Sequence, residues 1–206
     1  MTCVVYLDRQ HSGKPGRKAS DRGAAADLDG DGSISVDERE AMLTARYGLA
    51  AEAALIEAGH IVVPIADGWY SDRHRRVNQY AGTFPKHYPQ VYVSLHLNSG
   101  GLGDYGAVFY DHRSRSGPEL SARIAKQLRM VAPEVNGVKC IPAKPDDWTR
   151  NAYGTIGGIM QPVAICYEPC FMSNPAHADL LTREGLAAIG RALAAGIDAW
   201  ATTCEV

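Results

Sequence analysis

The sequence predicts a single-domain α/β protein in which a mostly parallel, twisted sheet is flanked by helices on both faces. Two observations lead to this fold class. Short apolar runs rich in valine and isoleucine alternate with longer segments of helical periodicity. The 206 residues are 46% apolar and 21% charged, which is enough to bury one full core. Because no repeat or linker divides the chain, residues 1–206 are expected to form one domain.

Strands are expected where apolar runs end at polar or glycine residues. Five runs meet this description, at 3–8, 60–65, 90–98, 106–111 and 162–168. Helical segments, rather than tight turns, separate most of them. Parallel strands need such long crossover connections, so the sheet is expected to be largely parallel.

Helices are predicted at 36–58, 71–81, 116–132 and 185–200. The first places Met42, Leu43, Leu49, Ala53 and Ile56 at roughly helical spacing. Gly59 is suited to end that helix, and Pro118 is suited to the first turn of the third.

Charge and composition exclude several classes of function. A net charge of -2 argues against broad binding to nucleic acid, and no apolar run reaches the ~20 residues of a membrane span. The five cysteines are scattered and odd in number, so we expect no disulfide framework and buried free thiols at Cys166 and Cys170. The N-terminus enters a strand without a leader, which predicts a protein that is made for the cytoplasm or leaves it by another route. We expect a monomer.

Residues 27–38, DLDGDGSISVDE, follow the pattern of an EF-hand calcium loop. Gly32 supplies the sharp turn at position 6, and Glu38 at position 12 is the expected bidentate ligand. The remaining expected Ca²⁺ ligands are Asp27, Asp29, Asp31 and the backbone carbonyl of Ser33. The preceding segment, KASDRGAAA, makes a poor entering helix, so a complete helix-loop-helix hand is not expected. Residues 14–33 are predicted to be an exposed insertion before the first helix.

Candidate catalytic residues follow the carboxyl ends of predicted strands, where ligands gather in open α/β sheets. These residues are His11, His96 and Glu168, and Glu38 and Glu40 begin the first predicted helix at the end of the calcium-type loop. Two histidines and a carboxylate at one sheet edge would form a zinc site with an open fourth position. A further glutamate could then act as general base. The residues alone leave other roles open, since a histidine near a strand end is often structural and Glu168 could cap a helix or pair with an arginine.

Four motifs in order carry a resemblance to a known family. They are YLDRQHSG (6–13), YSDRHRRVN (70–78), SLHLN (94–98) and YEPCFMSNP (167–175), and the helix that starts near Glu40 ends in AGHIV (58–62). Over nearly its whole length the chain resembles the zinc-dependent N-acetylmuramoyl-L-alanine amidases of the type-3 family. Two departures stand out: Cys170 replaces the usual glycine, and Arg9-Gln10 replaces Pro-Gly before the first histidine.

The resemblance implies roles for individual residues. Zn²⁺ would be bound by His11, Glu40 and His96, and Glu168 would be the catalytic carboxylate. The substrate would be bacterial peptidoglycan, cut at the amide between N-acetylmuramic acid and L-alanine. The family's Asn98 and Asn174 positions are expected to shape turns rather than take part in catalysis.

The calcium loop is then expected to be an accessory of the enzyme. Residues 38 and 40 lie about 200° apart on one helix, so Glu38 could close over Ca²⁺ while Glu40 faces zinc. Two alternatives stay open, namely a zinc peptidase acting within the stem peptide and a calcium-binding regulatory module. A compact amidase without a leader resembles a phage lysis enzyme, and a bacterial wall-remodelling enzyme whose leader had been removed would look the same. A phage lysis enzyme stays in the host cytoplasm until lysis and then acts on the cell wall.

Overall fold

A computed structural model describes residues 1–9, 11 and 23–204. Within them one six-stranded sheet has the strand order β2-β1-β3-β6-β4-β5. The strands are β1 (Val4–Arg9), β2 (Ile61–Ile65), β3 (Gln90–Leu95), β4 (Gly106–Asp111), β5 (Val138–Ala143) and β6 (Val163–Glu168). All neighbouring strands run parallel except β4 and β6, which are antiparallel. The predicted, mostly parallel sheet is therefore confirmed. The carboxyl ends of β1, β3 and β6 meet at one edge.

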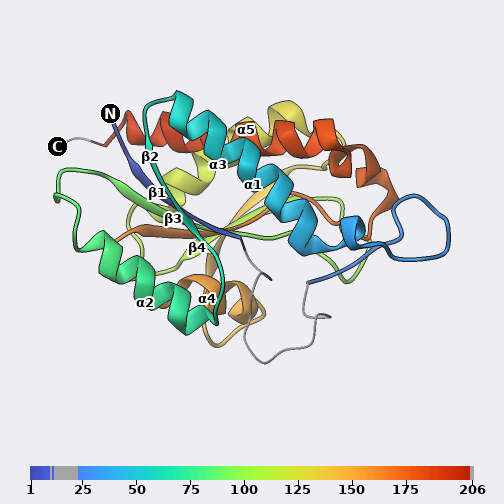
Figure 1. The fold of residues 1–206 in the computed structure, drawn as a ribbon, viewed down its shortest axis with the longest axis horizontal. Helices are drawn as coiled ribbons and strands as arrows, with labels where there is room; N and C mark the ends of the chain where they lie inside the picture. Colours follow the sequence, from blue (N-terminus) through green and yellow to red (C-terminus); the bar gives the residue numbers. More distant parts are fainter. Residues whose placement is uncertain (10, 12–22, 205–206) are drawn as a thin grey trace.

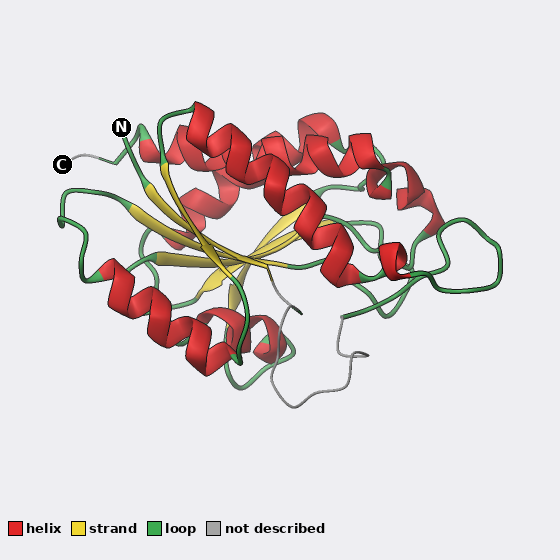
Figure 2. Ribbon diagram, in the orientation of Figure 1, coloured by secondary structure: helices red, strands yellow, loops and turns green. Residues whose placement is uncertain are grey.

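Helices cover both faces of this sheet, as predicted (Figures 1 and 2). One face is covered by α1 (Glu40–Glu57), α3 (Gly117–Val131) and α5 (Arg183–Ala201), and the other by α2 (Tyr70–Ala81) and α4 (Arg150–Ile156). Two short 3-10 helices, η1 (Val36–Glu38) and η2 (Pro175–Leu181), complete the described elements. Each face has its own apolar core, because residues of opposite parity along a strand point to opposite sides.

One strand and one α-helix are absent from the sequence prediction. The edge strand β5 has the sequence VKCIPA. Its Pro142 has no backbone N–H to donate, so it fits a sheet only at an edge strand or a bulge. Helix α4 has only seven residues, too few to show a helical period. Both elements lie outside the strong apolar runs on which the prediction relied.

The apolar residues that recur at helical spacing in the first helix are only partly its buried face. Leu43 is buried, but Leu49 and Ile56 are exposed. The face that packs on the core is instead Leu43, Tyr47, Ala51 and Leu55, at a spacing of four residues. Close packing against α5 explains the difference, since a Cβ added at Gly190 would lie 2.2 Å from the carbonyl oxygen of Tyr47. Small residues at such a contact carry little hydrophobic signal.

The predicted continuous helix over 36–58 is also wrong at its start. Arg39 is extended, with φ -98° and ψ 142°, and separates η1 from α1. Glu38 and Glu40 therefore do not share one helix, and the 200° argument does not apply to them. Arg39 instead pairs with Ala25 in an antiparallel bridge. Residues 23–26 are not helical, in agreement with the expectation that no entering helix precedes the acidic loop.

Several smaller predictions can be compared with the described residues. Gly59 follows α1 with φ +85°, as expected of a residue that ends a helix. Cys166 and Cys170 are buried free thiols, as predicted. No helix in the described ranges has the length and apolar character needed to cross a membrane. Of the predicted exposed insertion, residues 14–22 lie outside the described ranges.

Candidate metal centre

The sheet edge formed by β1, β3 and β6 brings together side chains that are distant in sequence. His11 follows β1, His96 follows β3, and Glu168 is the last residue of β6. The register aligns these ends, since Arg9 is opposite Leu95 and Leu95 is opposite Tyr167. Glu40 reaches the same edge from the first residue of α1. All four predicted site residues therefore converge in space.

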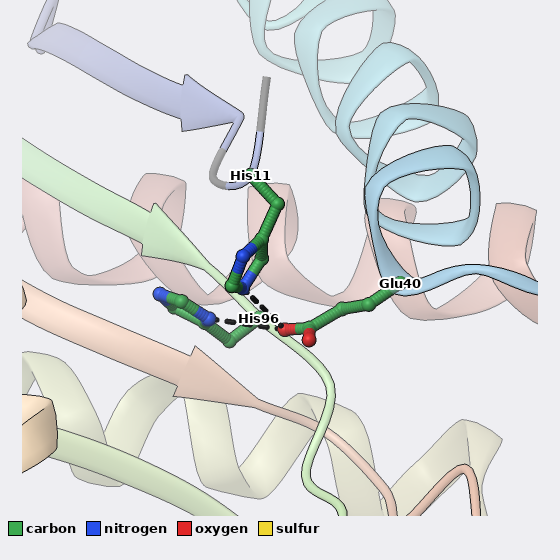
Figure 3. A group of neighbouring side chains, drawn as sticks. All are labelled: His11, Glu40 and His96. Carbon is green, nitrogen blue, oxygen red and sulfur yellow. Dashed lines mark hydrogen bonds and ion pairs between the residues drawn. The ribbon is translucent and has the colours of Figure 1, made fainter. Parts of the chain in front are cut away.

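Three of them form a tight cluster (Figure 3). Glu40 Oε1 lies 3.0 Å from His96 Nδ1 and 3.3 Å from His11 Nε2. Ligand atoms from all three residues lie within 4.8 Å of one another. The two imidazole rings stand almost perpendicular, at 87°, with their centroids 5.2 Å apart. Each ring therefore points one nitrogen at the same carboxylate oxygen.

This donor set fits a zinc ion. Zinc binds histidine nitrogen and carboxylate oxygen at roughly 2.0–2.2 Å in a tetrahedral arrangement, which puts neighbouring ligand atoms about 3.3 Å apart. The separations of 3.0 and 3.3 Å found here agree with that spacing. Glu40 and His96 are only 4% and 8% exposed. Three protein ligands would leave one tetrahedral position for water or substrate, as in catalytic zinc sites.

A buried ion pair fixes the strand end that carries His11. The Arg73 guanidinium, from α2, donates to the Asp8 carboxylate and, at 3.0 Å, to the carbonyl of Arg9. The Tyr92 hydroxyl donates to the second Asp8 oxygen at 2.5 Å. His11 follows with φ 62°, a left-handed conformation that non-glycine residues seldom adopt. Such strain is typical of functional sites, where the surroundings hold the residue in place.

Backbone donors hold the Glu40 carboxylate. Leu97 N–H donates to Oε1 at 3.1 Å, and Ala24 N–H donates to Oε2 at 2.9 Å. A Cβ added at Gly23 would lie 2.5 Å from Glu40 Oε2 and 2.9 Å from His11 Cδ2, so the backbone at Gly23 lies directly against the cluster. Burial alone raises the pKa of Glu40, but its hydrogen bonds to His11 and His96 and their charge lower that pKa well below the usual range. The carboxylate is therefore ionised and ready to act as a ligand.

His96 is held by the same network. The Tyr47 hydroxyl of α1 donates to the His96 carbonyl at 2.8 Å, so the helix that carries Glu40 also fixes the end of β3. Burial lowers the pKa of His96, but the hydrogen bond and charge of Glu40 outweigh burial and raise it. A cation that binds at His96 therefore competes with a proton.

Glu168 lines the same cavity of about 490 Å³ as His11, Glu40 and His96. Burial raises the pKa of Glu168 above its ordinary value, the Glu40 carboxylate raises it further, and His96 lowers it. The Cys166 thiol donates a weak hydrogen bond to Glu168 Oε1 at 3.8 Å. A partly desolvated carboxyl with a raised pKa, beside a candidate metal site, is suited to accept and return a proton.

The acidic loop holds a second, different cluster. Carboxylate oxygens of Asp27, Asp29 and Glu38 lie within 4.8 Å of one another. The Asp27 carboxylate accepts from Gly30 N–H at 2.8 Å and Gly32 N–H at 2.9 Å. Backbone N–H groups of Ser35 and Leu28 both donate to Glu38 at 2.6 Å, and these bonds lower its pKa. Asp27 and Asp29 are exposed, whereas Glu38 is buried.

The predicted calcium ligand Asp31 lies outside this group of carboxylates. Its carboxylate accepts from the backbone N–H and the hydroxyl of Ser33, both at 2.7 Å. The loop thus brings together three of the four carboxylates assigned to calcium from the sequence.

The two asparagines have the structural roles expected of them. Asn98 pairs through its backbone with Phe171, and its side chain accepts from Ser99 N–H at 2.9 Å. Asn174 caps η2 by accepting from Ala176 N–H at 3.0 Å. Both therefore shape turns of the chain, and Asn98 does so at the wall of the cavity.

The cavity also has a wall that the sequence analysis did not assign. Tyr70 from α2 and Arg150, Asn151 and Thr155 from α4 line it. Helix α4 was not predicted, and its residues form no recognisable motif. Only the three-dimensional packing of α4 against the sheet places them beside Glu168.

Comparisons with known proteins agree with this architecture. The sequence profile of a family described as N-acetylmuramoyl-L-alanine amidase matches residues 6–199. No curated protein sequence matches the chain significantly.

Solved structures with the same fold share little sequence with the chain. Cwp6 from Clostridium difficile has 21% identity and a TM-score of 0.70; 97% of the chain is covered but only 29% of Cwp6. The amidase AmiC2 of Nostoc punctiforme has 19% identity and a TM-score of 0.69, with 95% of the chain and 94% of AmiC2 covered. The catalytic domain of the CD27L endolysin, which targets Clostridia difficile, has 19% identity and a TM-score of 0.56. The match covers 94% of the chain and 97% of the endolysin domain.

Proposed function

The chain belongs to the N-acetylmuramoyl-L-alanine amidase family, and from this premise we propose that His11, Glu40 and His96 hold a zinc ion beside which Glu168 drives amide hydrolysis. The bond cut is the amide between the lactyl group of N-acetylmuramic acid and L-alanine in bacterial peptidoglycan. The observation that carries the proposal is the convergence of two imidazole nitrogens on one buried carboxylate oxygen, at zinc-like spacing, in the cavity that Glu168 lines.

Bound zinc would supply Lewis acidity, which lowers the pKa of water toward ~7 and stabilises developing negative charge on the scissile carbonyl. The Glu168 carboxylate accepts the proton of the attacking water. It then returns that proton to the nitrogen of L-alanine as the amide bond breaks, so the leaving group departs as an amine. The raised pKa of Glu168 suits both steps, because a group that exchanges a proton twice works best with a pKa near the operating pH. No covalent intermediate with the protein is needed.

We further propose that residues 27–38 bind Ca²⁺ and brace the zinc ligand Glu40. The loop is closed at its base by backbone pairing between 24–26 and 38–40. Glu40 N–H donates to the Ala24 carbonyl at 2.9 Å, and Ala25 bridges Arg39. The same Ala24 donates its own N–H to Glu40 Oε2. Closing the loop around a cation would therefore stiffen the pairing that holds the Glu40 carboxylate.

Packing supports the same view of the loop. Leu28 packs against the core on the α1 face, and Glu38 is buried between the loop and α1. Glu40 begins α1 directly after this segment. The loop is thus anchored to the scaffold at its base, while its acidic tip projects from the molecule (Figure 1).

For the biological role we propose a phage lysis enzyme, which stays in the host cytoplasm until lysis and then reaches the cell wall. An endolysin catalytic domain has this fold, as do the other proteins compared above, so the fold is compatible with this role without selecting it.

Digestion of purified peptidoglycan, followed by mass spectrometry, tests the reaction. The amidase releases intact stem peptides with a free L-alanine amino group and leaves unsubstituted glycan, and chelation abolishes the release until zinc is restored. A zinc peptidase would instead give fragments cut inside the stem peptide. Products of that kind, or release that survives chelation, would contradict the proposal.

A further inference from the structure

Arg150 brings a positive charge to a cavity that otherwise carries carboxylates. It is the only lysine or arginine among the described residues that line the cavity of the candidate metal centre. Glu40 and Glu168 line the same space. A negatively charged group on a substrate would be attracted at Arg150.

The Arg150 side chain is exposed and makes no ion pair or hydrogen bond with a described residue. Other arginines near the sheet edges are neutralised within the fold. Arg9 pairs with Glu52 at 2.7 Å, and Arg113 pairs with Asp111 at 2.5 Å while also donating to the Gly157 carbonyl. The guanidinium of Arg150 therefore keeps its full donor capacity for a ligand.

The backbone that presents Arg150 is well fixed. Thr149, the residue before it, is buried, and its hydroxyl donates to Asp147 and accepts from Lys144 N–H at 2.8 Å. Further along α4, His74 Nε2 bonds the Thr155 carbonyl at 2.8 Å and so ties α4 to α2. A cationic group on such a platform can discriminate between ligands, because little ordering is required on binding.

The size of the cavity limits how far this anion lies from the bond that is cut. A compact space of 490 Å³ is about 10 Å across, and two extended residues span at most about 7 Å. An anion held at Arg150 therefore belongs to a group within one or two residues of the reacting amide. In a peptidoglycan stem peptide that group is the α-carboxylate of the second residue, D-glutamate, which some cell walls carry as a carboxamide.

We propose that Arg150 is a specificity-determining residue that binds this α-carboxylate, so that the enzyme prefers stem peptides with D-glutamate to those with the amidated residue. The inference rests on the proposed amidase function. A guanidinium forms two parallel hydrogen bonds with a carboxylate, whereas a carboxamide offers one acceptor and brings donors that face the guanidinium.

The test compares N-acetylmuramoyl-L-alanyl-D-glutamate, with its γ-carboxyl capped as the methylamide, with the same compound carrying an α-carboxamide, so that the α-carboxylate is the only anionic group that differs. The zinc-loaded wild type should hydrolyse the carboxylate form with a kcat/KM roughly 10- to 100-fold higher, mainly through KM. Arg150→Gln should cleave both at similar rates, and Arg150→Lys should keep part of the preference. Arg191→Gln, which removes an exposed arginine of α5 outside the cavity, should retain all of it.

A wild type without preference, or an Arg150→Gln variant that keeps it, would overturn the assignment of Arg150. Cleavage of neither substrate at the lactyl–alanine amide would instead overturn the amidase proposal and, with it, this inference.

Discussion

Two clusters of metal-ligand side chains meet at Arg39 and are built in opposite ways. The buried cluster joins His11, Glu40 and His96, and Glu40 and His96 are 56 residues apart in the sequence. The acidic cluster lies within twelve consecutive residues, and its Asp27 and Asp29 are exposed. The first exists only when the sheet and α1 have assembled. The second can form from its own turns.

This difference in construction predicts a difference in role. Burying a carboxylate and two imidazoles costs free energy unless a partner compensates them, so a fold that assembles such a group from three distant segments has a use for it. Exposed carboxylates in a local loop cost little. We therefore assign chemistry to the buried cluster and support to the loop. The experiments below test that division.

The largest effect is expected at the one carboxyl that shares the cavity with the buried cluster. Glu168→Gln should lower kcat by ~10²–10⁴-fold with zinc retained, because the amide has nearly the same shape but cannot accept a proton. The matched change in the loop, Glu38→Gln, should leave most of the activity. Peptide release from peptidoglycan measures the activity of both variants. Equal losses in the two would contradict the assignment of chemistry to the buried cluster and support to the loop.

A pair of glycines tests how closely the loop's base touches the buried cluster. Gly23 and Gly59 both have positive φ, at +79° and +85°, so alanine strains the backbone similarly at each. Only at Gly23 would the new Cβ meet Glu40 and His11. Gly23→Ala should weaken zinc binding by roughly 10- to 100-fold, the range seen when groups that orient metal ligands are disturbed.

Competition with a zinc chelator reports this affinity. Gly59→Ala is the control and should bind zinc like the wild type. Equal zinc affinity in both variants would mean that Gly23 does not support the cluster.

The two clusters should also differ in their response to pH. The pKa of His96 is raised, so as pH falls its proton begins to compete with zinc above the ordinary value of about 6.5. Below the raised pKa of His96, zinc affinity should fall by at least tenfold per pH unit, because zinc must displace the His96 proton. The loop ligands are carboxylates, and the pKa of Glu38 is lowered, so calcium affinity should stay constant from pH 8 to pH 6. Titration calorimetry at several pH values measures both, and a flat zinc curve would contradict the assignment of His96.

The smallest effect on activity is expected in the loop. Asp27→Ala with Asp29→Ala should remove calcium binding and reduce activity only partly, with full dependence on zinc preserved. Calcium at a hundredfold excess over Kd stabilises the folded state by about 2.7 kcal/mol, which raises the Tm of a domain of this size by roughly 5–10 °C. The wild type should show this rise and the double variant should not.

Glu57→Ala with Glu134→Ala removes two exposed carboxylates elsewhere and should keep the calcium response. If calcium changes neither the Tm nor the rate of the zinc-saturated wild type, the loop does not brace Glu40.

The two clusters also differ in how they could be predicted from the sequence. Both clusters were proposed from sequence, but by different routes. The loop is local, so its residues could be read from one motif. The buried cluster depended on strand ends and on family resemblance, because no short-range pattern links His11 to His96. Strong apolar runs correctly located β1, β3 and β6, and with them the edge at which the site forms.

Features that depend on packing between distant segments were not predicted from the sequence, or were predicted incorrectly. The extended conformation of Arg39 follows from its pairing with Ala25 across the loop, which no helical periodicity reports. The buried face of α1 depends on the close approach of Gly190 to that helix. Arg150 lies beside the site only because α4 packs against the sheet.

Zinc content tests the central claim most directly, because Glu38 and Glu40 are two residues apart, both buried, and assigned to different clusters. After exhaustive dialysis against metal-free buffer containing calcium, the wild type and Glu38→Ala should retain one zinc ion per chain, and Glu40→Ala should retain none. A Glu40→Ala variant that keeps stoichiometric zinc, or a Glu38→Ala variant that loses it while still folded, would contradict the account.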